Sequence, residues 1–417
     1  MFEAVITGMG VQNAIGAGVP NFELSLRQGT CGIRHHQIGP NATPTIMAAL
    51  TDYDFATALT TITDLPELTR RLARRVALRL PLSTRLSVST ALEAFCHARL
   101  QDRGIARERL GLVIAGQNLS QNYSYGLRKR FDENPDYLLP SYALQFLDTN
   151  QVGAISEVLG IGGEGFTVGG ASAGGNVALL HARRMLACGE ADACVVVGAM
   201  ADLSPLEMQA FFSVGAMAGK KFKDHPQAAC RPFDRDREGF VYGEGTACVI
   251  LETQASAQRR QVPVLGTLIG ASLKLDGNSL TNPNKDGEIA VMQACLAQAG
   301  ISPSQVDYVN SHGTASVLGD ETEAAALCAV FGAHQPMVNS TKSLTGHCLY
   351  AAGLVEAVAC LIQMNGGFVH ANLNLEHPMD TSLNLAPAQA QDMVITHALS
   401  NSFGFGGINT SILLRSP

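Results

Sequence analysis

The chain of 417 residues has no tryptophan, and only 16% of its residues are charged. None of its ten cysteines forms a CxxC pair, which argues against a zinc site and a disulfide framework. We find no signal peptide and no apolar run of 18 residues, so we expect a cytoplasmic protein that does not span a membrane. The net charge of −7 argues against a nucleic-acid-binding protein.

Nucleotide-binding motifs are also missing. The chain has no Walker A sequence, and the stretch Gly163-Glu164-Gly165 lacks the third glycine of the dinucleotide fingerprint. The sequence therefore predicts no nucleotide cofactor, and no residue is assigned to a metal.

Apolar runs of strand length alternate with amphipathic segments of helix length. This alternation predicts an α/β fold whose sheets are covered on both faces. The pattern restarts after a polar connector at 254–261, which divides the chain into two similar halves, residues 1–254 and 255–417. We expect strands at 4–10, 110–115, 193–198, 264–269 and 306–310, and helices within 66–101 and at 176–188, 287–299, 321–331 and 353–364.

The turn at 169–176 is made of glycine, alanine, serine and asparagine, and it leads from an apolar run into the helix expected at 176–188. Glycine permits a sharp turn, and the first N–H groups of a helix are unpaired and partly positive. Ser172 offers the functional hydroxyl of this turn, so it is a candidate nucleophile beside a candidate oxyanion site.

Four other stretches combine turn glycines with reactive side chains. His312 follows an apolar strand, the place where α/β folds put functional groups. Lys342 and His347 are five residues apart across a turn, so both are expected to face one cavity. Shortly after His312 come the carboxylates of Asp320 and Glu323; capping of the next helix is an equally good interpretation of Asp320. The fourth stretch is the glycine-rich loop at 402–409, which contains Phe405.

These stretches resemble the elongating β-ketoacyl-ACP synthases of the thiolase fold. The matches lie at 231–240, 243–245, 312–314, 340–347 and 402–409, in the family's order and across nearly the whole chain. The resemblance implies a five-layered α-β-α-β-α fold built from two similar halves. It also implies a cytoplasmic homodimer whose site lies near the subunit interface and receives the phosphopantetheine arm of an acyl carrier protein.

The resemblance also implies roles for the site residues. His312 and His347 polarise the malonyl thioester carbonyl, and Lys342 with Glu323 organises them. The backbone N–H groups of Ser172 and Phe405 form an oxyanion hole, with the Phe405 side chain as a gate. The two remaining supporting residues are Thr314 and Asp320.

Ser172 departs from the family, which has a cysteine nucleophile at this position. A serine hydroxyl is far less acidic than a thiol, and an ester is a poorer electrophile than a thioester. Decarboxylation of malonyl needs no enzyme nucleophile, only donors to the enolate oxygen. The chain therefore resembles the free-standing ketosynthase-like malonyl-ACP decarboxylases of polyketide β-branching cassettes, whose acetyl-ACP feeds an HMG-CoA-synthase-like enzyme.

Three alternatives stay open on the sequence. Ser172 itself could be acylated in a condensing enzyme or an acyltransferase. The chain could also be a non-catalytic partner subunit like a chain-length factor, although such subunits usually lose the catalytic histidines as well. An engineered exchange of cysteine for serine is the third, and the altered residues around Ser172 argue against it.

Three basic patches are candidates for docking the acidic carrier protein. For each patch, a solvated surface without a partner is the more common explanation. The patches are Arg70, Arg71, Arg74 and Arg75; Arg128, Lys129 and Arg130; and Lys220, Lys221 and Lys223.

Overall fold

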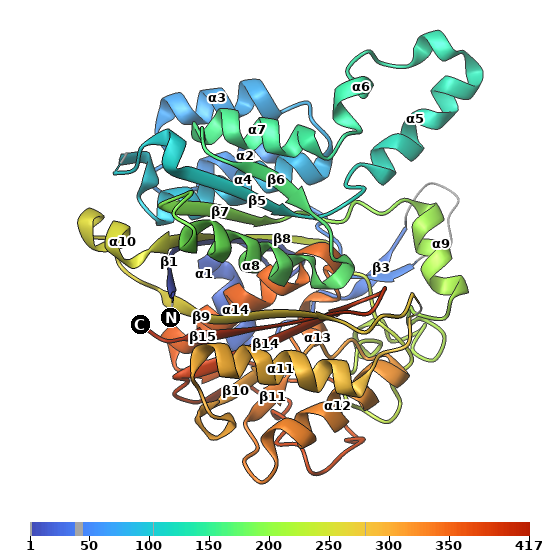
Figure 1. Ribbon diagram of the computed structural model, residues 1–417. Coiled ribbons are helices and arrows are strands. Elements are labelled where there is room, and N and C mark those ends of the chain that lie inside the picture. Colours follow the sequence, from blue (N-terminus) through green and yellow to red (C-terminus); the bar gives the residue numbers. More distant parts are fainter. Residues whose placement is uncertain (1, 38–44, 103, 280) are drawn as a thin grey trace.

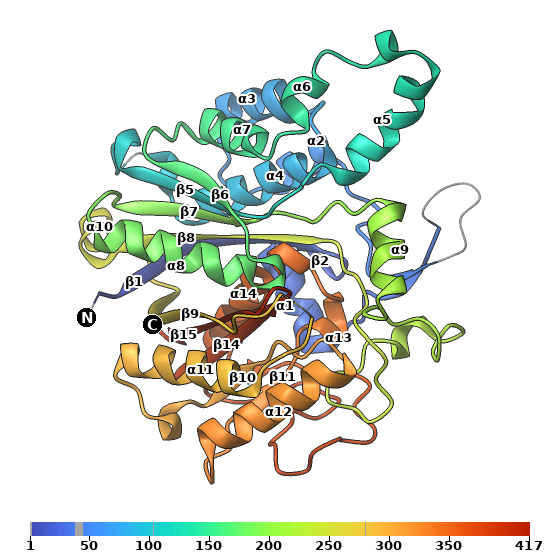
Figure 2. The same cartoon turned by 45° about the vertical axis from the view of Figure 1, so that its right-hand side comes forward.

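The computed structural model describes residues 2–37, 45–102, 104–279 and 281–417. In this part of the chain, helices and strands stack in five layers, as Figure 1 shows. Two sheets alternate with an outer helical layer at the top, a central pair of helices and a second outer layer at the bottom. The turned view in Figure 2 shows the same stack. The predicted α-β-α-β-α architecture is confirmed.

The two halves have the same strand order. Within the described residues, the first half arranges its strands as β1-β8-β7-β5-β6 and the second as β9-β15-β14-β10-β11. When the five strands of each half are numbered along the chain, both sheets have the order first, fifth, fourth, second and third. The bounds are β1 (Ala4–Asn13), β5 (Leu110–Ala115), β6 (Gly165–Val168), β7 (Ala193–Gly198), β8 (Gly245–Thr253), β9 (Gly266–Leu275), β10 (Tyr308–Asn310), β11 (Met337–Asn339), β14 (His397–Gly404) and β15 (Ile408–Arg415).

The pairing pattern repeats as well. The second strand of each half is parallel to the third and fourth, and the fifth strand is antiparallel to its neighbours. The two sheets join where β1 pairs with β9 over Ala4–Ile6. Because one ladder runs through both halves, the boundary at residue 254 stays a prediction. The polar connector expected there forms a short helix, α10 (Gln254–Arg260).

The helices divide among the layers by the faces they cover. α4 packs on β1 and β8, while α11 packs on β9 and β15. The central helices α8 and α14 touch strands of both sheets. The helices are α1 (Val19–Gln28), α2 (Phe55–Thr61), α3 (Glu67–Ala77), α4 (Leu82–His97), α5 (Gln121–Glu133), α6 (Tyr142–Gln145), α7 (Thr149–Leu159), α8 (Gly174–Ala187), α9 (Pro205–Ser213), α11 (Lys285–Ala299), α12 (Val317–Phe331), α13 (Lys342–Thr345) and α14 (Ala352–Gly366).

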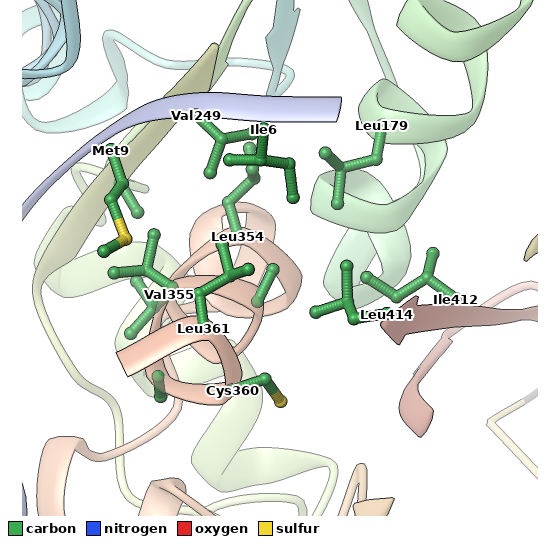
Figure 3. Packing of buried hydrophobic residues seen from close by; sticks show 14 of the residues in the cluster. Ile6, Met9, Leu179, Val249, Leu354, Val355, Cys360, Leu361, Ile412 and Leu414 are labelled. Carbon is green, nitrogen blue, oxygen red and sulfur yellow. The ribbon is translucent and has the colours of Figure 1, made fainter. Parts of the chain in front are cut away.

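The central layer is apolar on all sides because a sheet covers it above and below. Figure 3 shows Leu179 of α8 and Leu354 of α14 among side chains from β1, β8 and β15. The two helices approach closely because both carry glycine at the crossing. A Cβ on Gly175 would lie 2.6 Å from the backbone nitrogen of Leu354. This close crossing fixes the start of α8, which follows directly on Ser172.

The stretch Leu349–Gly366 corrects one expectation from the sequence. It is long and apolar enough to cross a membrane, whereas the sequence analysis found no such run. It is, however, 83% buried inside the protein, between the two sheets. Its hydrophobicity is that of a core helix in the central layer.

Candidate active site

Ser172 lies in a one-turn 3₁₀ segment, Ala171–Ala173, between β6 and α8. The chain turns sharply here, and Ala171 has a φ of 45°, in the left-handed region. The glycine-rich loop closes over the turn: a Cβ on Gly404 would lie 2.7 Å from the carbonyl oxygen of Gly170. The sequence therefore places a small, half-buried hydroxyl on a backbone that other segments hold tightly.

His347 faces Ser172 from the segment that follows α13. Its backbone is fixed because its N–H donates to the carbonyl oxygen of Val241 at 2.7 Å. Its ring nitrogen Nε2 is 2.9 Å from the Ser172 Oγ. On the other side of the ring, the backbone N–H of Leu349 donates to Nδ1 at 3.2 Å.

The contact with Leu349 assigns the tautomer of His347. A backbone N–H can only donate, so Nδ1 accepts and the ring proton resides on Nε2. Burial and the nearby Lys342 ammonium hold the pKa of His347 well below its usual range, so the ring is neutral. In this state Nε2–H donates to the Ser172 hydroxyl and is unable to take its proton.

His312 lies in the same pocket, directly after β10. Its ring is 5.6 Å from that of His347, centroid to centroid, and nearly perpendicular to it. Phe403 packs against the His312 ring at the same distance. Burial, Lys342 and His347 hold the pKa of His312 well below its usual range, so this imidazole is also neutral. Its buried Nδ1 has no hydrogen-bond partner among the described residues.

Lys342 supports the site from behind. It is fully buried and forms an ion pair with Glu356 of α14, a residue that the sequence analysis did not single out. The organising role predicted for Lys342 with Glu323 stays a prediction, and the ion-pair partner of Lys342 is Glu356. The structure corrects the expectation that Lys342 and His347 both face the cavity, because only His347 lines it. Burial raises the pKa of Glu356 to about 7, opposed by the ammonium of Lys342.

Glu323 acts on His312 through the backbone. Its two carboxylate oxygens accept the N–H groups of His312 and Gly313, each at 2.8 Å. Burial raises the pKa of Glu323, and these bonds oppose the rise. The predicted organising role thus has a geometric basis in the loop after β10 rather than in contact with Lys342.

Asp320 and Thr314 occupy different places. Asp320 is buried in the first turn of α12 and accepts the backbone N–H groups of Phe233 at 2.8 Å and Ala315 at 3.1 Å. It joins the loop at 231–240 to the His312 loop and does not line the cavity. Thr314 does line it, and its hydroxyl donates to the Ser316 Oγ at 3.0 Å.

A cavity of about 710 Å³ connects Ser172, His312, Thr314 and His347. Phe405, 43% exposed, lies at its wall, with its ring centroid 6.5 Å from that of Phe211. The position suits a movable aromatic side chain; the oxyanion role of its N–H stays a prediction. Residues that line the cavity include Ser172, Phe211, Val214–Ala216, Glu238, Asp276, Glu288, His312, Thr314, His347, Phe403 and Phe405.

Sequence reasoning missed two buried carboxyls of this region. The sequence does contain a signal for a buried Glu356, because this residue is the charged one in the otherwise apolar run 352–362. Glu288 follows a polar loop and looks like an ordinary first-turn acid on a helix. Its burial depends on the packing of α11 against β9, which no local pattern reveals.

Comparison with known proteins agrees with this geometry. The model of the β-ketoacyl synthase N-terminal domain matches residues 1–257, and that of the C-terminal domain matches residues 265–376. The chain belongs to the β-ketoacyl synthase family.

Among curated members of this family, the polyketide biosynthesis malonyl-ACP decarboxylase PksF of Bacillus subtilis is 38% identical over 414 residues, covering 99% of this chain and 96% of that protein. The chloroplastic 3-oxoacyl-[acyl-carrier-protein] synthase II of Arabidopsis thaliana is 32% identical, covering 98% of this chain and 75% of that protein. A solved β-ketoacyl synthase from Burkholderia phymatum superposes with a TM-score of 0.85 at 25% identity, covering 100% of both chains.

Proposed function

We propose that this protein decarboxylates malonyl carried on an acyl carrier protein and releases acetyl on the same carrier. The observation that carries the proposal is the hydrogen bond between His347 and Ser172. The Nε2–H of a neutral imidazole points at the place where a thioester oxygen would sit, and the hydroxyl accepts from it. The name of the Bacillus relative, a malonyl-ACP decarboxylase, supports the same activity.

The chemistry follows from charge development. When the bond between C2 and the carboxylate of malonyl breaks, its electrons move toward the thioester oxygen and CO2 leaves. A fixed donor at that oxygen lowers the barrier by about 3–4 kcal/mol. His347 supplies one such donor, and His312, 5.6 Å away between ring centroids, is placed to supply a second.

Condensation has less support in this site. It would require Ser172 to lose a proton and accept an acyl group, and the neighbouring His347 donates rather than accepts. Ser172 is thus better suited to hydrogen-bond the bound thioester than to attack it.

The third basic patch is the best placed to dock the carrier. Lys220 and Lys221 are exposed, and their backbone N–H groups donate to Glu238, which lines the cavity. Val214–Ala216, just before them, also line it. A structural relative at 25% identity is described as a ketosynthase in complex with an acyl carrier protein, which supports this type of partner. Positive charge at the cavity mouth would attract an acidic carrier.

We further propose the wider setting that the family resemblance implies. The protein would act in the cytoplasm as a homodimer, and its acetyl-carrier product would be used by an HMG-CoA-synthase-like enzyme. Gel filtration with light scattering tests the dimer directly.

The decisive assay for the activity follows the mass of the carrier arm. Malonyl-loaded carrier is incubated with the enzyme, with and without an acyl donor. We expect loss of CO2 without condensation and no stable acyl group on the enzyme. A mass increase at Ser172 would favour the acylating alternative, and an unchanged malonyl arm would favour a non-catalytic partner subunit.

A further inference from the structure

Decarboxylation leaves a requirement that condensation does not have. A condensing enzyme uses the C2 carbanion equivalent to attack an acyl group, whereas a decarboxylase must deliver a proton to C2. The following inference rests on the proposed function and concerns the source of that proton. His347 is unsuited to the task because its Nε2–H is directed at the Ser172 hydroxyl, where the proposed function places the thioester oxygen, and its Nδ1 accepts from Leu349.

Among the described residues, three carboxyl groups line the cavity, and two of them already accept hydrogen bonds. Glu238 accepts the backbone N–H groups of Gly219, Lys220 and Lys221. Asp276 accepts from the side-chain amide of Asn409 at 2.7 Å. Glu288 differs, because its buried Oε2 has no hydrogen-bond partner in the part of the chain that the structure describes.

Glu288 also lacks a positive partner within the described residues. It is 1% exposed, in the first turn of α11. The charged groups that act on it are themselves acidic: Glu323 and Asp320 on α12 and Asp276 after β9. Burial and these carboxylates raise the pKa of Glu288 well above its usual range. A carboxyl in such surroundings keeps its proton near neutral pH.

We propose that the Glu288 carboxyl is the general acid that protonates C2 of the enolate. It is a protic group in the same cavity as His312, with an oxygen not committed to any partner among the described residues. Glu323 is linked to both groups, because its carboxylate accepts the His312 backbone N–H and its charge acts on Glu288.

The step balances as follows. The C2–carboxylate bond breaks and CO2 leaves. The enolate then re-forms its carbonyl as C2 takes the proton from the Glu288 O–H. Glu288 is left as a carboxylate among acidic neighbours and regains a proton from solvent. One solvent proton is consumed per acetyl group formed, and no oxidant or reductant is needed.

The test compares the wild-type enzyme with Glu288→Gln, which keeps the shape of the side chain but lacks the acidic proton. Two quantities are measured: formation of the acetyl arm, and exchange of ¹³C-labelled CO2 into the unreacted malonyl arm. Without its acid, the enolate should persist and recapture CO2. We expect acetyl formation to fall about a hundredfold, in the range typical of general acids, while exchange per acetyl formed rises.

Two further variants serve as a control and as a replacement for Glu288→Gln. Asp286→Asn removes one exposed carboxylate from the same turn of α11, outside the cavity, and should change neither quantity. If Glu288→Gln does not fold, Glu288→Met provides a second variant without the acid, checked by its melting temperature.

Several results would overturn the proposal. Acetyl formation at the wild-type rate in Glu288→Gln would mean that water protonates C2. A parallel fall in acetyl formation and CO2 exchange would make Glu288 a determinant of cavity shape only. If the wild-type enzyme itself forms no acetyl arm, the proposed function fails, and with it this role for Glu288.

Discussion

At the scale of single residues, the backbone N–H of Leu349 governs what the site can do. By donating to Nδ1 of His347, it leaves the proton on Nε2, toward Ser172. Where a histidine acts as the base for a serine nucleophile, the hydrogen bond runs in the opposite direction, and the imidazole accepts from the hydroxyl. In the proposed reaction this pair of side chains would therefore stabilise the thioester oxygen, because one main-chain contact sets the tautomer.

The change Ser172→Cys tests whether the turn still suits a nucleophile. A thiol at the start of α8 would ionise more readily than a free thiol, whose pKa is about 8.5. We expect the introduced thiol to become alkylated by iodoacetamide and to take up an acyl group from acyl carrier protein. Because Cys188 is exposed in the native protein, modification must be read on the peptide containing position 172. An inert thiol would show that the turn has lost its activating environment.

At the scale of elements, two contacts hold the site in place: the crossing of α8 with α14, and the ion pair between α13 and α14. The crossing joins helices that are far apart in the sequence, and the ion pair joins two consecutive helices. Lys342 and Glu356 are buried together, and the Ser402 hydroxyl of β14 donates to Glu356 at 3.4 Å. The start of α8 and the His347 segment are thus positioned by one helix, α14.

The Gly175→Ala change should disturb this crossing. The added Cβ would lie 2.6 Å from a backbone nitrogen of α14, so the helices must separate. We expect a loss of about 1–3 kcal/mol in the free energy of unfolding, measured by urea titration, as is usual for overpacked cores. Gly153→Ala, at an exposed position of α7, is the control, because a Cβ added at Gly153 would have no described atom within 4 Å apart from its chain neighbours and its own helix backbone. That control should be neutral or slightly stabilising, and equal effects in the two variants would refute the account.

Lys342→Met should lower the free energy of unfolding by more than the change in side-chain volume alone would. It leaves Glu356 buried without its ammonium partner, which typically costs about 3–5 kcal/mol. Adding Glu356→Gln should restore much of the lost stability, because no unpaired carboxylate remains. The measurement is the free energy of unfolding of both variants; a single variant as stable as the wild type would contradict a structural role for the pair.

At the scale of the whole molecule, the sequence motifs predicted the architecture well, and the structure adds what motifs cannot contain. The restart of the apolar pattern after 254–261 and the family resemblance of the motifs indicated two similar halves. The partner of Lys342, by contrast, depends on how α13 packs against α14, and the burial of Glu288 depends on α11 lying on β9. Such pairings arise from tertiary packing, which local periodicity does not encode.

The positive charge of Lys220 and Lys221, whose backbone bonds the cavity-lining Glu238, gives a prediction for the complex with the carrier protein. Replacing Lys220 and Lys221 with glutamate should raise KM for carrier-bound malonyl several-fold, while KM for a free malonyl-pantetheine thioester stays constant. The difference should shrink at high salt, because exposed charges are screened. The control reverses Arg74 and Arg75 on α3, which contributes no described residue to the cavity. An equal effect of both reversals would exclude a specific docking role for Lys220 and Lys221.

The most direct measurement of the central claim compares His347→Ala with Ser172→Ala on malonyl-loaded carrier protein. The claim is that the chemistry depends on the imidazole donor and not on the serine hydroxyl. We predict that the rate of acetyl formation falls about 10²–10³-fold when the His347 donor is removed. The Ser172→Ala variant should keep much of the wild-type rate. Equal loss in both variants would contradict the claim, because it would make Ser172 a participant in the decarboxylation itself.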